Sequence, residues 1–207
     1  MSGAGLVSGV FAVVPVKDLA GTKSRLAPVL NPGARAGLTL YMMGRVVRAL
    51  REAGVGDVCV VSPDPVVLNE ALGRDAVPLL QRSQGLNPAL EEGRARALAA
   101  DASTLLVLPA DLPLLEAGDV RAVLEAAGER PGVVLSPDGT RSGTNALLSR
   151  PPDALPFLFG PDSFEAHLRA ARGRGLDPRI CERPHLAFDL DTAGDLARLK
   201  QTGAPRL

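Results

Sequence analysis

The stretch Thr104-Leu-Leu-Val-Leu-Pro-Ala-Asp-Leu-Pro-Leu115 decides how this chain folds. It opens with an apolar run without polar alternation, which is typical of a strand buried on both faces of a parallel sheet. Two prolines flank Asp111 and cannot continue a central strand, so Asp111 is expected just past the strand's carboxyl end. Open parallel sheets bind ligands at that edge, which makes Asp111 a candidate ligand of a divalent metal or a substrate hydroxyl. The alternative is that Asp111 only caps the helix that begins near Glu116.

Strand-like and helix-like segments alternate through the first 130 residues. The sequence predicts strands at 10–16, 57–62, 76–80 and 104–108, and helices at 31–53, 65–72, 87–100 and 116–127, with Asn31 and Asn87 as helix caps. This order indicates an α/β fold with a mostly parallel sheet and helices on both faces.

The remaining third departs from strict alternation. We expect strands at 132–136, 144–149 and 179–182, helices at 164–172 and 192–200, and an alternating apolar segment at 186–191. No linker separates two domains, so residues 1–207 are predicted to form a single domain with loose ends at 1–8 and 203–207.

Composition narrows the class of protein. The 207 residues carry no formal net charge, which gives no general attraction to nucleic acid or to a membrane surface. Aromatic residues make up only 3% of the chain, too few for a base-stacking platform, and no apolar run reaches the roughly 20 residues of a membrane span. The first residues lack a secretory leader, and Cys59 and Cys181 are predicted to be buried thiols. We therefore expect a cytoplasmic protein.

The loop from Lys17 to Leu26 follows the first predicted strand and carries Lys17, Lys23 and Arg25 together with a glycine, a threonine and a serine. Clustered cations and free backbone N–H groups are what the phosphates of a nucleotide need. The loop matches neither a Walker motif nor a dinucleotide fingerprint. The alternative is an ordinary solvated basic loop.

Three further carboxylates occur in Phe188-Asp-Leu-Asp-Thr-Ala-Gly-Asp195. On a strand, Asp189 and Asp191 would share one face about 7 Å apart, within reach of one divalent ion or a pair. Asp191 also resembles a plain helix cap, and Asp195 is expected to be solvated.

Two glycine-bearing polar segments, 141–145 and 159–164, precede apolar segments. The hydroxyls of Thr144 and Ser163 could bind a carboxylate or phosphate, and the backbone N–H groups of 160–163 precede a helix. Ordinary turn and cap chemistry is the alternative. His167 and His185 lack partners at metal-ligand spacing, so we do not expect them to bind metal.

Several motifs follow one another in a recognisable order: Pro15-Val-Lys17, Lys23-Ser-Arg-Leu26, Gly85-Leu-Asn87, Ala110-Asp-Leu-Pro113, Gly143-Thr-Asn145, Phe159-Gly-Pro-Asp-Ser-Phe164 and Asp189-Leu-Asp-Thr192. From about residue 11 to 199 the chain resembles the CofC/FbiD family, the guanylyltransferases of coenzyme F-420 biosynthesis. It is more distantly similar to molybdopterin-cofactor and sugar-phosphate nucleotidylyltransferases, whose first loop is glycine-rich where this one carries lysines.

This resemblance implies a three-layer, Rossmann-like nucleotidyltransferase fold of the GT-A-like type. It implies transfer of GMP from GTP to phosphoenolpyruvate or 2-phospho-L-lactate with release of pyrophosphate. Archaeal members of the family use 2-phospho-L-lactate, and at least some bacterial members use phosphoenolpyruvate. The Arg-, Ala- and Gly-rich composition is typical of a GC-rich bacterial genome and therefore favours phosphoenolpyruvate. The family's acid-binding residues fall on Thr144, Gly160 and Ser163, and its metal carboxylates fall on Asp111, Asp189 and Asp191.

The mechanism that we expect from this resemblance needs no general base, because the attacking phosphate is already ionised near neutral pH. Two Mg²⁺ ions held by the three aspartates would bridge the two polyanions. Lys17, Lys23 and Arg25 would neutralise the leaving pyrophosphate. Gly85 and Asn87 are the candidates for contact with guanine or ribose.

Two rival functions stay open at this point. One is another nucleotidylyltransferase, of the molybdenum-cofactor or sugar-phosphate type. The other is a non-catalytic nucleotide-binding protein on the same fold. The sequence also leaves open whether the chain forms a homodimer and whether it hands its product directly to the next enzyme.

Overall fold

The computed structural model describes residues 7–128 and 131–202. Its centre is a seven-stranded sheet in the order β3-β2-β1-β4-β6-β5-β7. The strands are β1 (Val7–Pro15), β2 (Val55–Ser62), β3 (Val77–Leu80), β4 (Thr104–Val107), β5 (Gly132–Pro137), β6 (Thr144–Arg150) and β7 (Arg179–Ile180). Strand β6 runs antiparallel to β4 and β5, and the other paired strands are parallel. The prediction of a mostly parallel sheet is confirmed.

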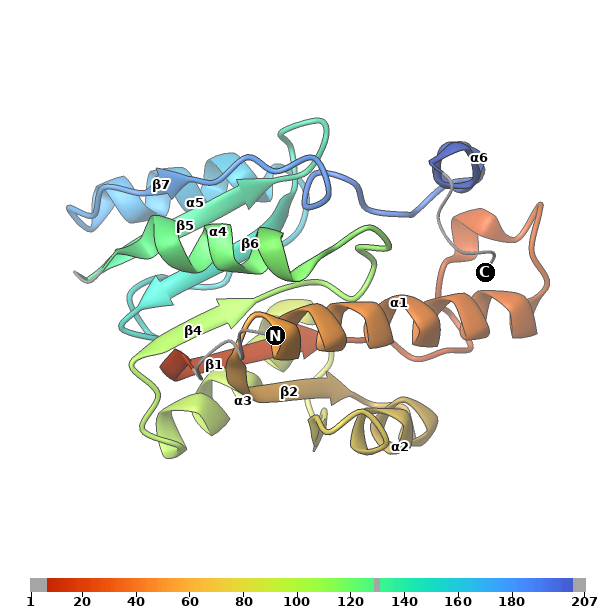
Figure 1. Cartoon of the computed structure of the whole chain (residues 1–207), viewed down its shortest axis with the longest axis horizontal. Coiled ribbons are helices and arrows are strands. Elements are labelled where there is room, and N and C mark those ends of the chain that lie inside the picture. Colours follow the sequence, from red (N-terminus) through yellow and green to blue (C-terminus); the bar gives the residue numbers. More distant parts are fainter. Residues whose placement is uncertain (1–6, 129–130, 203–207) are drawn as a thin grey trace, which may run out of the picture.

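Helices cover both faces of this sheet (Figure 1). They are α1 (Pro32–Glu52), α2 (Pro65–Leu72), α3 (Leu86–Ala99), α4 (Ala117–Ala127), α5 (Ser163–Gly173) and α6 (Ala193–Gln201), with a 3-10 turn η1 (Ser24–Leu26). Alternate side chains of β1 enter opposite cores: Val10, Ala12 and Val14 lie with α1, α2 and α4, whereas Phe11 and Val13 lie with α3 and α5. Such a strand is apolar throughout because both of its faces are buried. The predicted three-layer α/β fold is confirmed.

Two helix starts show how local sequence sets the boundaries. The Asn31 side chain accepts a hydrogen bond from Ala34 N–H at 2.8 Å, which caps α1 as predicted. Glu116 caps α4 and forms a capping box with Asp119. The interpretation of Asp111 as the cap of α4 is therefore wrong, and its carboxylate is available for another partner.

The start of α3 differs from the prediction. The helix begins at Leu86 and its cap is Gly85, with φ of 99°, whereas Asn87 lies inside the first turn. The Asn87 side chain does not cap the helix because both ends of its amide bind the backbone of Phe159.

The alternating segment 186–191 does not form a strand. Leu186, Phe188 and Leu190 are buried as the pattern predicts. Their neighbour is the loop after β4 rather than a strand edge, and Leu190 N–H donates to the Asp111 carbonyl at 3.0 Å. This contact brings the acidic residues of the segment to the carboxyl edge of the sheet.

A small third core joins η1, α1 and α6, which lie close together in Figure 1. It contains Leu26, Leu38, Met42, Phe188 and Leu196. Burial of these side chains fixes the loop after β1 against the segment that leads into α6. Two parts of the chain that are about 165 residues apart thereby become neighbours.

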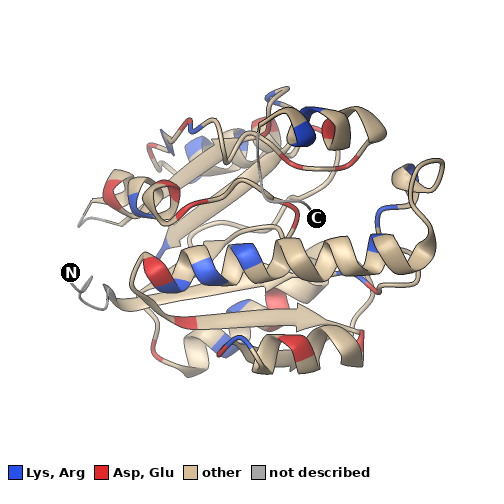
Figure 2. Cartoon of the chain, turned by 45° about the vertical axis from the view of Figure 1, so that its right-hand side comes forward, with Lys and Arg blue, Asp and Glu red and all other residues tan. Residues whose placement is uncertain are grey.

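Other expectations concern the surface and the ends. Cys59 and Cys181 are buried free thiols, as predicted. No helix within 7–128 and 131–202 is long and apolar enough to cross a membrane. Figure 2 shows acidic and basic residues interspersed along the helices seen in that view. The sequence predicts loose ends at 1–8 and 203–207. Residues 1–6 and 203–207 lie outside the described residues, whereas Val7 and Ser8 belong to β1. The single-domain organisation stays a prediction.

Candidate active site

Lys23 lies between two carboxylates that come from distant parts of the chain. Its Nζ is 2.8 Å from Asp111 Oδ2 and 2.7 Å from Asp191 Oδ1. The Lys23 side chain is only 8% exposed, and its backbone has a φ of 48°, in the left-handed region that few residues other than glycine adopt. Three of the predicted site residues therefore meet at the carboxyl edge of the sheet.

Asp191 reaches this position because it is not used as a helix cap. Thr192 caps α6 instead, and Asp195 completes the capping box. The Asp195 carboxylate accepts N–H bonds from Thr192 at 2.8 Å and from Asp191 at 3.2 Å. The interpretation of Asp191 as a plain cap is therefore wrong, and Asp195, which is partly exposed, has a capping role that the sequence did not indicate.

The charges around Lys23 favour its protonated form. Burial lowers the pKa of Lys23, but attraction by the carboxylates of Asp111 and Asp191 outweighs this effect, and the pKa lies above its ordinary value. Lys23 therefore carries a positive charge at neutral pH. In the free protein this single cation lies between two carboxylates and offsets one of their two negative charges.

Asp189 is the third predicted metal carboxylate. Burial raises the pKa of Asp189, and repulsion from Asp111 and Asp191 raises it further; the Asn145 amide, 3.4 Å away, opposes this shift. Asn145 is itself fixed by a bond to the Leu186 carbonyl at 2.8 Å. The ionised form of Asp189 is therefore disfavoured first by burial and then by the two neighbouring carboxylates.

The remaining predicted cations lie on the surface of the same region. Arg25 is 76% exposed, and its Nη1 is 3.9 Å from Asp191 Oδ2. Lys17 is exposed at the start of the loop. Both line a groove of about 800 Å³ together with Lys23, Asp111 and Asp191. A groove of this size can hold most of a nucleotide.

The chemistry of the three carboxylates fits a magnesium ion. Carboxylate oxygens are hard ligands of the kind that Mg²⁺ prefers, and a cation, the ammonium of Lys23, already lies between two of them. Across the part of the chain that the structure describes, no three His, Cys, Asp or Glu side chains form a compact metal centre. The ligand set of Asp111, Asp189 and Asp191 thus stays a prediction.

The loop after β3 forms the opposite wall of the groove. The Glu92 carboxylate accepts N–H bonds from Arg82 at 3.1 Å and from Ser83 at 2.8 Å, and the Gln81 amide donates to the Gly85 carbonyl at 3.2 Å. Gly85 lines the groove, and its contact with the nucleotide stays a prediction. The role of Glu92 was not predicted, because a glutamate on a helix gives no sequence signal of this kind.

Asn87 connects this wall to the other half of the site. Its Nδ2 donates to the Phe159 carbonyl at 3.0 Å, and Phe159 N–H donates to its Oδ1 at 2.9 Å. The side chain is therefore engaged by protein on both ends of its amide. The predicted contact of Asn87 with guanine or ribose stays a prediction, and the structure adds a bridging role that the sequence did not indicate.

The predicted acid-binding residues Thr144 and Ser163 are adjacent. Ser163 Oγ donates to Thr144 Oγ1 at 3.3 Å, and Thr144 Oγ1 is 3.0 Å from His167 Nδ1. All three side chains are buried. Gly160 has a φ of 144°, and a Cβ at this position would meet no atom within 4 Å, so backbone conformation rather than space favours glycine.

The acid-binding residues predicted from the sequence are not among the described residues that line the groove. The described residues that line it include Lys17, Lys23, Arg25, Gly85, Asp111 and Asp191 but not Asn87, Thr144, Gly160, Ser163 or Asp189. Phe159 lines the groove and borders both regions. Extension of the pairing of Val107 with Leu147 by three residues puts Thr144 level with Ala110. The hydroxyl pair therefore lies at the same sheet edge as Asp111.

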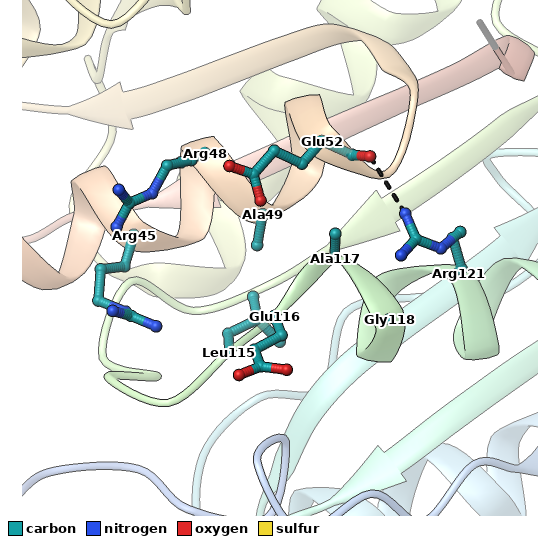
Figure 3. Close-up of a pocket in the computed structure, with 9 residues that line it drawn as sticks. All are labelled: Arg45, Arg48, Ala49, Glu52, Leu115, Glu116, Ala117, Gly118 and Arg121. Carbon is teal, nitrogen blue, oxygen red and sulfur yellow. Dashed lines mark hydrogen bonds between the residues drawn. The ribbon is translucent and has the colours of Figure 1, made fainter. Parts of the chain in front are cut away.

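A second pocket, of about 350 Å³, opens between α1 and the start of α4 (Figure 3). Arg45 and Arg48 of α1 face Glu116 and Arg121 across it, and Arg121 donates to the Glu52 carbonyl at 3.1 Å. None of the predicted site residues is among the described residues that line it. Because it holds none of the residues that the sequence singles out, it is a weaker candidate for the active site than the groove beside Lys23.

Comparison with solved structures bears on the fold. CMP:2-keto-3-deoxy-manno-octonic acid synthetase in complex with CTP matches with a TM-score of 0.64 and 17% identity, covering 95% of this chain and 99% of that one. The 4-diphosphocytidyl-2C-methyl-D-erythritol synthase of Anaerococcus prevotii matches with a TM-score of 0.66 and 9% identity, covering 95% and 98%. The chain therefore has the Rossmann-like fold of these nucleotidyltransferases.

Comparison of sequences bears on the family. A phosphoenolpyruvate guanylyltransferase of Rubrobacter xylanophilus is 64% identical over 194 residues, which cover 94% of this chain and 95% of that protein. Another, of Sphaerobacter thermophilus, is 47% identical over 190 residues, which cover 91% of each. The model of the family described as "Guanylyl transferase CofC like" matches residues 10–205. The chain belongs to this family of CofC-like guanylyl transferases.

Proposed function

We propose that this protein transfers GMP from GTP to phosphoenolpyruvate and releases pyrophosphate, as a step of coenzyme F-420 biosynthesis. The choice of acceptor follows the relative from Rubrobacter xylanophilus, which is 64% identical and is named a phosphoenolpyruvate guanylyltransferase. 2-Phospho-L-lactate is the second acceptor to be tested. Cytoplasmic location is part of the same proposal.

The observation that carries the chemistry is the position of the Lys23 ammonium, between Asp111 and Asp191 at the edge of the groove. Both reactants are polyanions, so repulsion between them is the first barrier to reaction. A fixed cation next to carboxylates that can bind metal reduces this repulsion. Because the charge is already in position, no reorganisation is needed when the reaction occurs. This arrangement suits phosphoryl transfer better than acid–base chemistry.

In the proposed reaction, an oxygen of the acceptor phosphate attacks the α-phosphorus of GTP in line. The new O–P bond forms as the bond from the α-phosphorus to the bridging oxygen breaks, and pyrophosphate leaves with that electron pair. Lys17, Lys23 and Arg25 neutralise the charge that grows on the leaving group. No side chain has to remove a proton, because the acceptor phosphate is already ionised.

Asp111, Asp189 and Asp191 would hold magnesium, and we propose two ions. Bound Mg²⁺ supplies Lewis-acid stabilisation of phosphate charge. Thr144, Gly160 and Ser163 bind the three-carbon acid, and Gly85 and Asn87 lie on the nucleotide side. Phe159, which borders both regions, is the meeting point of the two substrates in this proposal.

The direct test is release of pyrophosphate from GTP by the purified protein with each acid, with and without Mg²⁺. We expect release with phosphoenolpyruvate that depends on the metal. Release only with a molybdopterin cofactor or a sugar phosphate, or only with CTP, would assign one of the rival transferase functions instead. Binding of GTP without release in the presence of any of these acceptors would indicate a non-catalytic nucleotide-binding protein.

A further inference from the structure

His167 is a buried side chain that the proposed reaction does not use. It lies on α5, its exposed fraction is 0%, and the edge of its ring faces Phe159 with centroids 4.9 Å apart. Both of its ring nitrogens have partners: Leu158 N–H at Nε2 and Thr144 Oγ1 at Nδ1, each at 3.0 Å. An imidazole held at both nitrogens has a fixed orientation.

These partners determine which nitrogen carries the proton. A backbone N–H can only donate, so Nε2 must accept from Leu158 and cannot carry a hydrogen. Burial lowers the pKa of His167 to about 4, although an interaction with the Ser163 backbone opposes the shift, so the ring is neutral at physiological pH. A neutral ring with a bare Nε2 has its hydrogen on Nδ1. His167 therefore donates to Thr144 Oγ1.

The direction of this bond sets the polarity of the neighbouring hydroxyls. Thr144 and Ser163 each carry one hydroxyl hydrogen. The Ser163 hydrogen is donated to Thr144 Oγ1. Thr144 Oγ1 thus accepts from both His167 and Ser163, and its own hydrogen is left to donate. No acceptor for that hydrogen occurs among the described residues. The pair is therefore prepared to donate one hydrogen bond to a ligand.

We propose that His167 is a positioning residue that holds the Thr144 and Ser163 hydroxyls as a donor to the carboxylate of the phosphorylated three-carbon acid. The proposal rests on the proposed function for the identity of this acid. A carboxylate is a pure acceptor, so it requires a donor at this point. In the opposite tautomer, with hydrogen on Nε2, Nδ1 would be an acceptor and the Thr144 hydroxyl would donate its hydrogen to the ring. The Thr144 oxygen would then offer only lone pairs to the carboxylate of the acid.

The location of the pair supports this assignment. Thr144 and Asn145 are consecutive residues at the start of β6, and their side chains face opposite sides of the sheet: Thr144 contacts His167, whereas Asn145 binds Asp189. The hydroxyl pair and the predicted metal carboxylate Asp189 therefore flank the same strand end. An acid whose phosphate is near Asp189 would have its carboxylate a few ångströms away, since phosphate and carboxylate are attached to the same carbon. The proposal requires that one short ligand at this strand end contacts both groups.

The test compares three variants by steady-state kinetics of pyrophosphate release. In His167→Phe, KM for phosphoenolpyruvate should rise about tenfold or more, as expected for loss of a hydrogen bond to a charged group, while KM for GTP stays within about twofold. His167→Asn, whose amide can donate near the Nδ1 position, should recover part of the loss. His185→Phe is the matched control; His185 binds Asp119 at 3.0 Å away from the groove, and its variant should leave both KM values unchanged.

Two measurements do not require activity. Thermal unfolding reports whether each variant is folded, and ¹⁵N NMR of the imidazole reports its tautomer. We expect Nδ1–H in the free protein, and binding of phosphoenolpyruvate measured by calorimetry should weaken about tenfold in folded His167→Phe. This result in a protein that releases no pyrophosphate would overturn the proposed function but support the role of His167. Hydrogen on Nε2, equal affinity of the folded variant, or no binding to the wild type would overturn the role of His167.

Discussion

At the scale of single residues, Lys23 is the side chain on which the proposed chemistry depends most. Its ammonium contacts Asp111 and Asp191 in the free protein and would neutralise pyrophosphate during the reaction. We expect Lys23→Ala to lower kcat by roughly 10²–10³, the loss typical of a charge-stabilising donor. The measurement is the initial rate of pyrophosphate release at saturating GTP and acid.

Lys200→Ala is the control for this substitution, because Lys200 is an exposed lysine on α6 and is not among the residues that line the groove. Its kcat should match that of the wild type. A Lys23→Ala enzyme that keeps its turnover within about threefold of wild type would remove Lys23 from the proposed mechanism.

The ionised carboxylate of Asp189 lowers the stability of the folded protein when no metal is bound. Its raised pKa, caused first by burial and then by Asp111 and Asp191, means that the ionised carboxylate destabilises the folded state. This contribution favours folding at acidic pH and is lost as the pH rises through the pKa of the folded protein. Asp189→Asn should therefore raise the Tm at pH 7 in EDTA, and it should reduce the increase in Tm that Mg²⁺ gives to the wild type.

Asp195→Asn is the matched control with the opposite sign. Burial raises the pKa of Asp195, but hydrogen bonds from Thr192 and from the backbone outweigh it, and the pKa is lowered. The ionised form of Asp195 thus stabilises the fold, and the substitution should lower the Tm at pH 7. If Asp189→Asn also lowers the Tm in EDTA, the ionised Asp189 does not destabilise the fold. If the substitution leaves the response to Mg²⁺ unchanged, Asp189 does not belong to the ligand set.

At the scale of elements, Asn87 ties the start of α3 to the loop that leads into α5. Its amide both donates to and accepts from the backbone of Phe159, next to Gly160. We expect Asn87→Ala to loosen this loop and to raise KM for the acid by about tenfold, since two part-buried bonds to the Phe159 backbone are lost. Hydrogen exchange of the Phe159 amide measures the loosening directly.

Asn87→Asp separates the two bonds, because a carboxylate can accept from Phe159 N–H but cannot donate to its carbonyl. Its effect should lie between those of the wild type and Asn87→Ala. Asn69→Ala, at an exposed position of α2, should change neither exchange nor KM. Unchanged exchange at Phe159 in Asn87→Ala would show that the bridge does not hold the loop.

The same elements show what sequence patterns can and cannot predict. The apolar run of β4 and the prolines around Asp111 predict a buried strand and a carboxylate at its end, because burial on both faces and loss of a backbone donor act locally. The segment 186–191 has the alternation of a strand, but a strand needs a partner, and its neighbour here is a loop. Asn87 and His167 act through bonds to Phe159 and Thr144, and no local pattern records such distant partners.

At the scale of the whole molecule, the resemblance to the CofC/FbiD family assigned distant residues to one site, which local sequence patterns could not do. Lys23, Asp111 and Asp191 are far apart in the sequence, and the topology makes them neighbours through the carboxyl edge of the sheet and the core beneath α6. Thr144 reaches the same edge because β6 is reversed relative to β4. A mostly parallel sheet with one reversed strand therefore allows a site to be built from both halves of the chain.

The stability of this sheet should depend on pH through Cys59, which is fully buried in β2. Burial raises the pKa of its thiol to about 12 from an ordinary 9.0. The unfolded chain therefore loses this proton first as the pH rises, and the stabilisation, complete below pH 9, is lost between about 9 and 12 at up to about 1.4 kcal/mol per pH unit. Urea unfolding from pH 8 to 10.5 should show a steeper loss for the wild type than for Cys59→Ala. Equal slopes would mean that Cys59 ionises as readily in the fold as in the open chain.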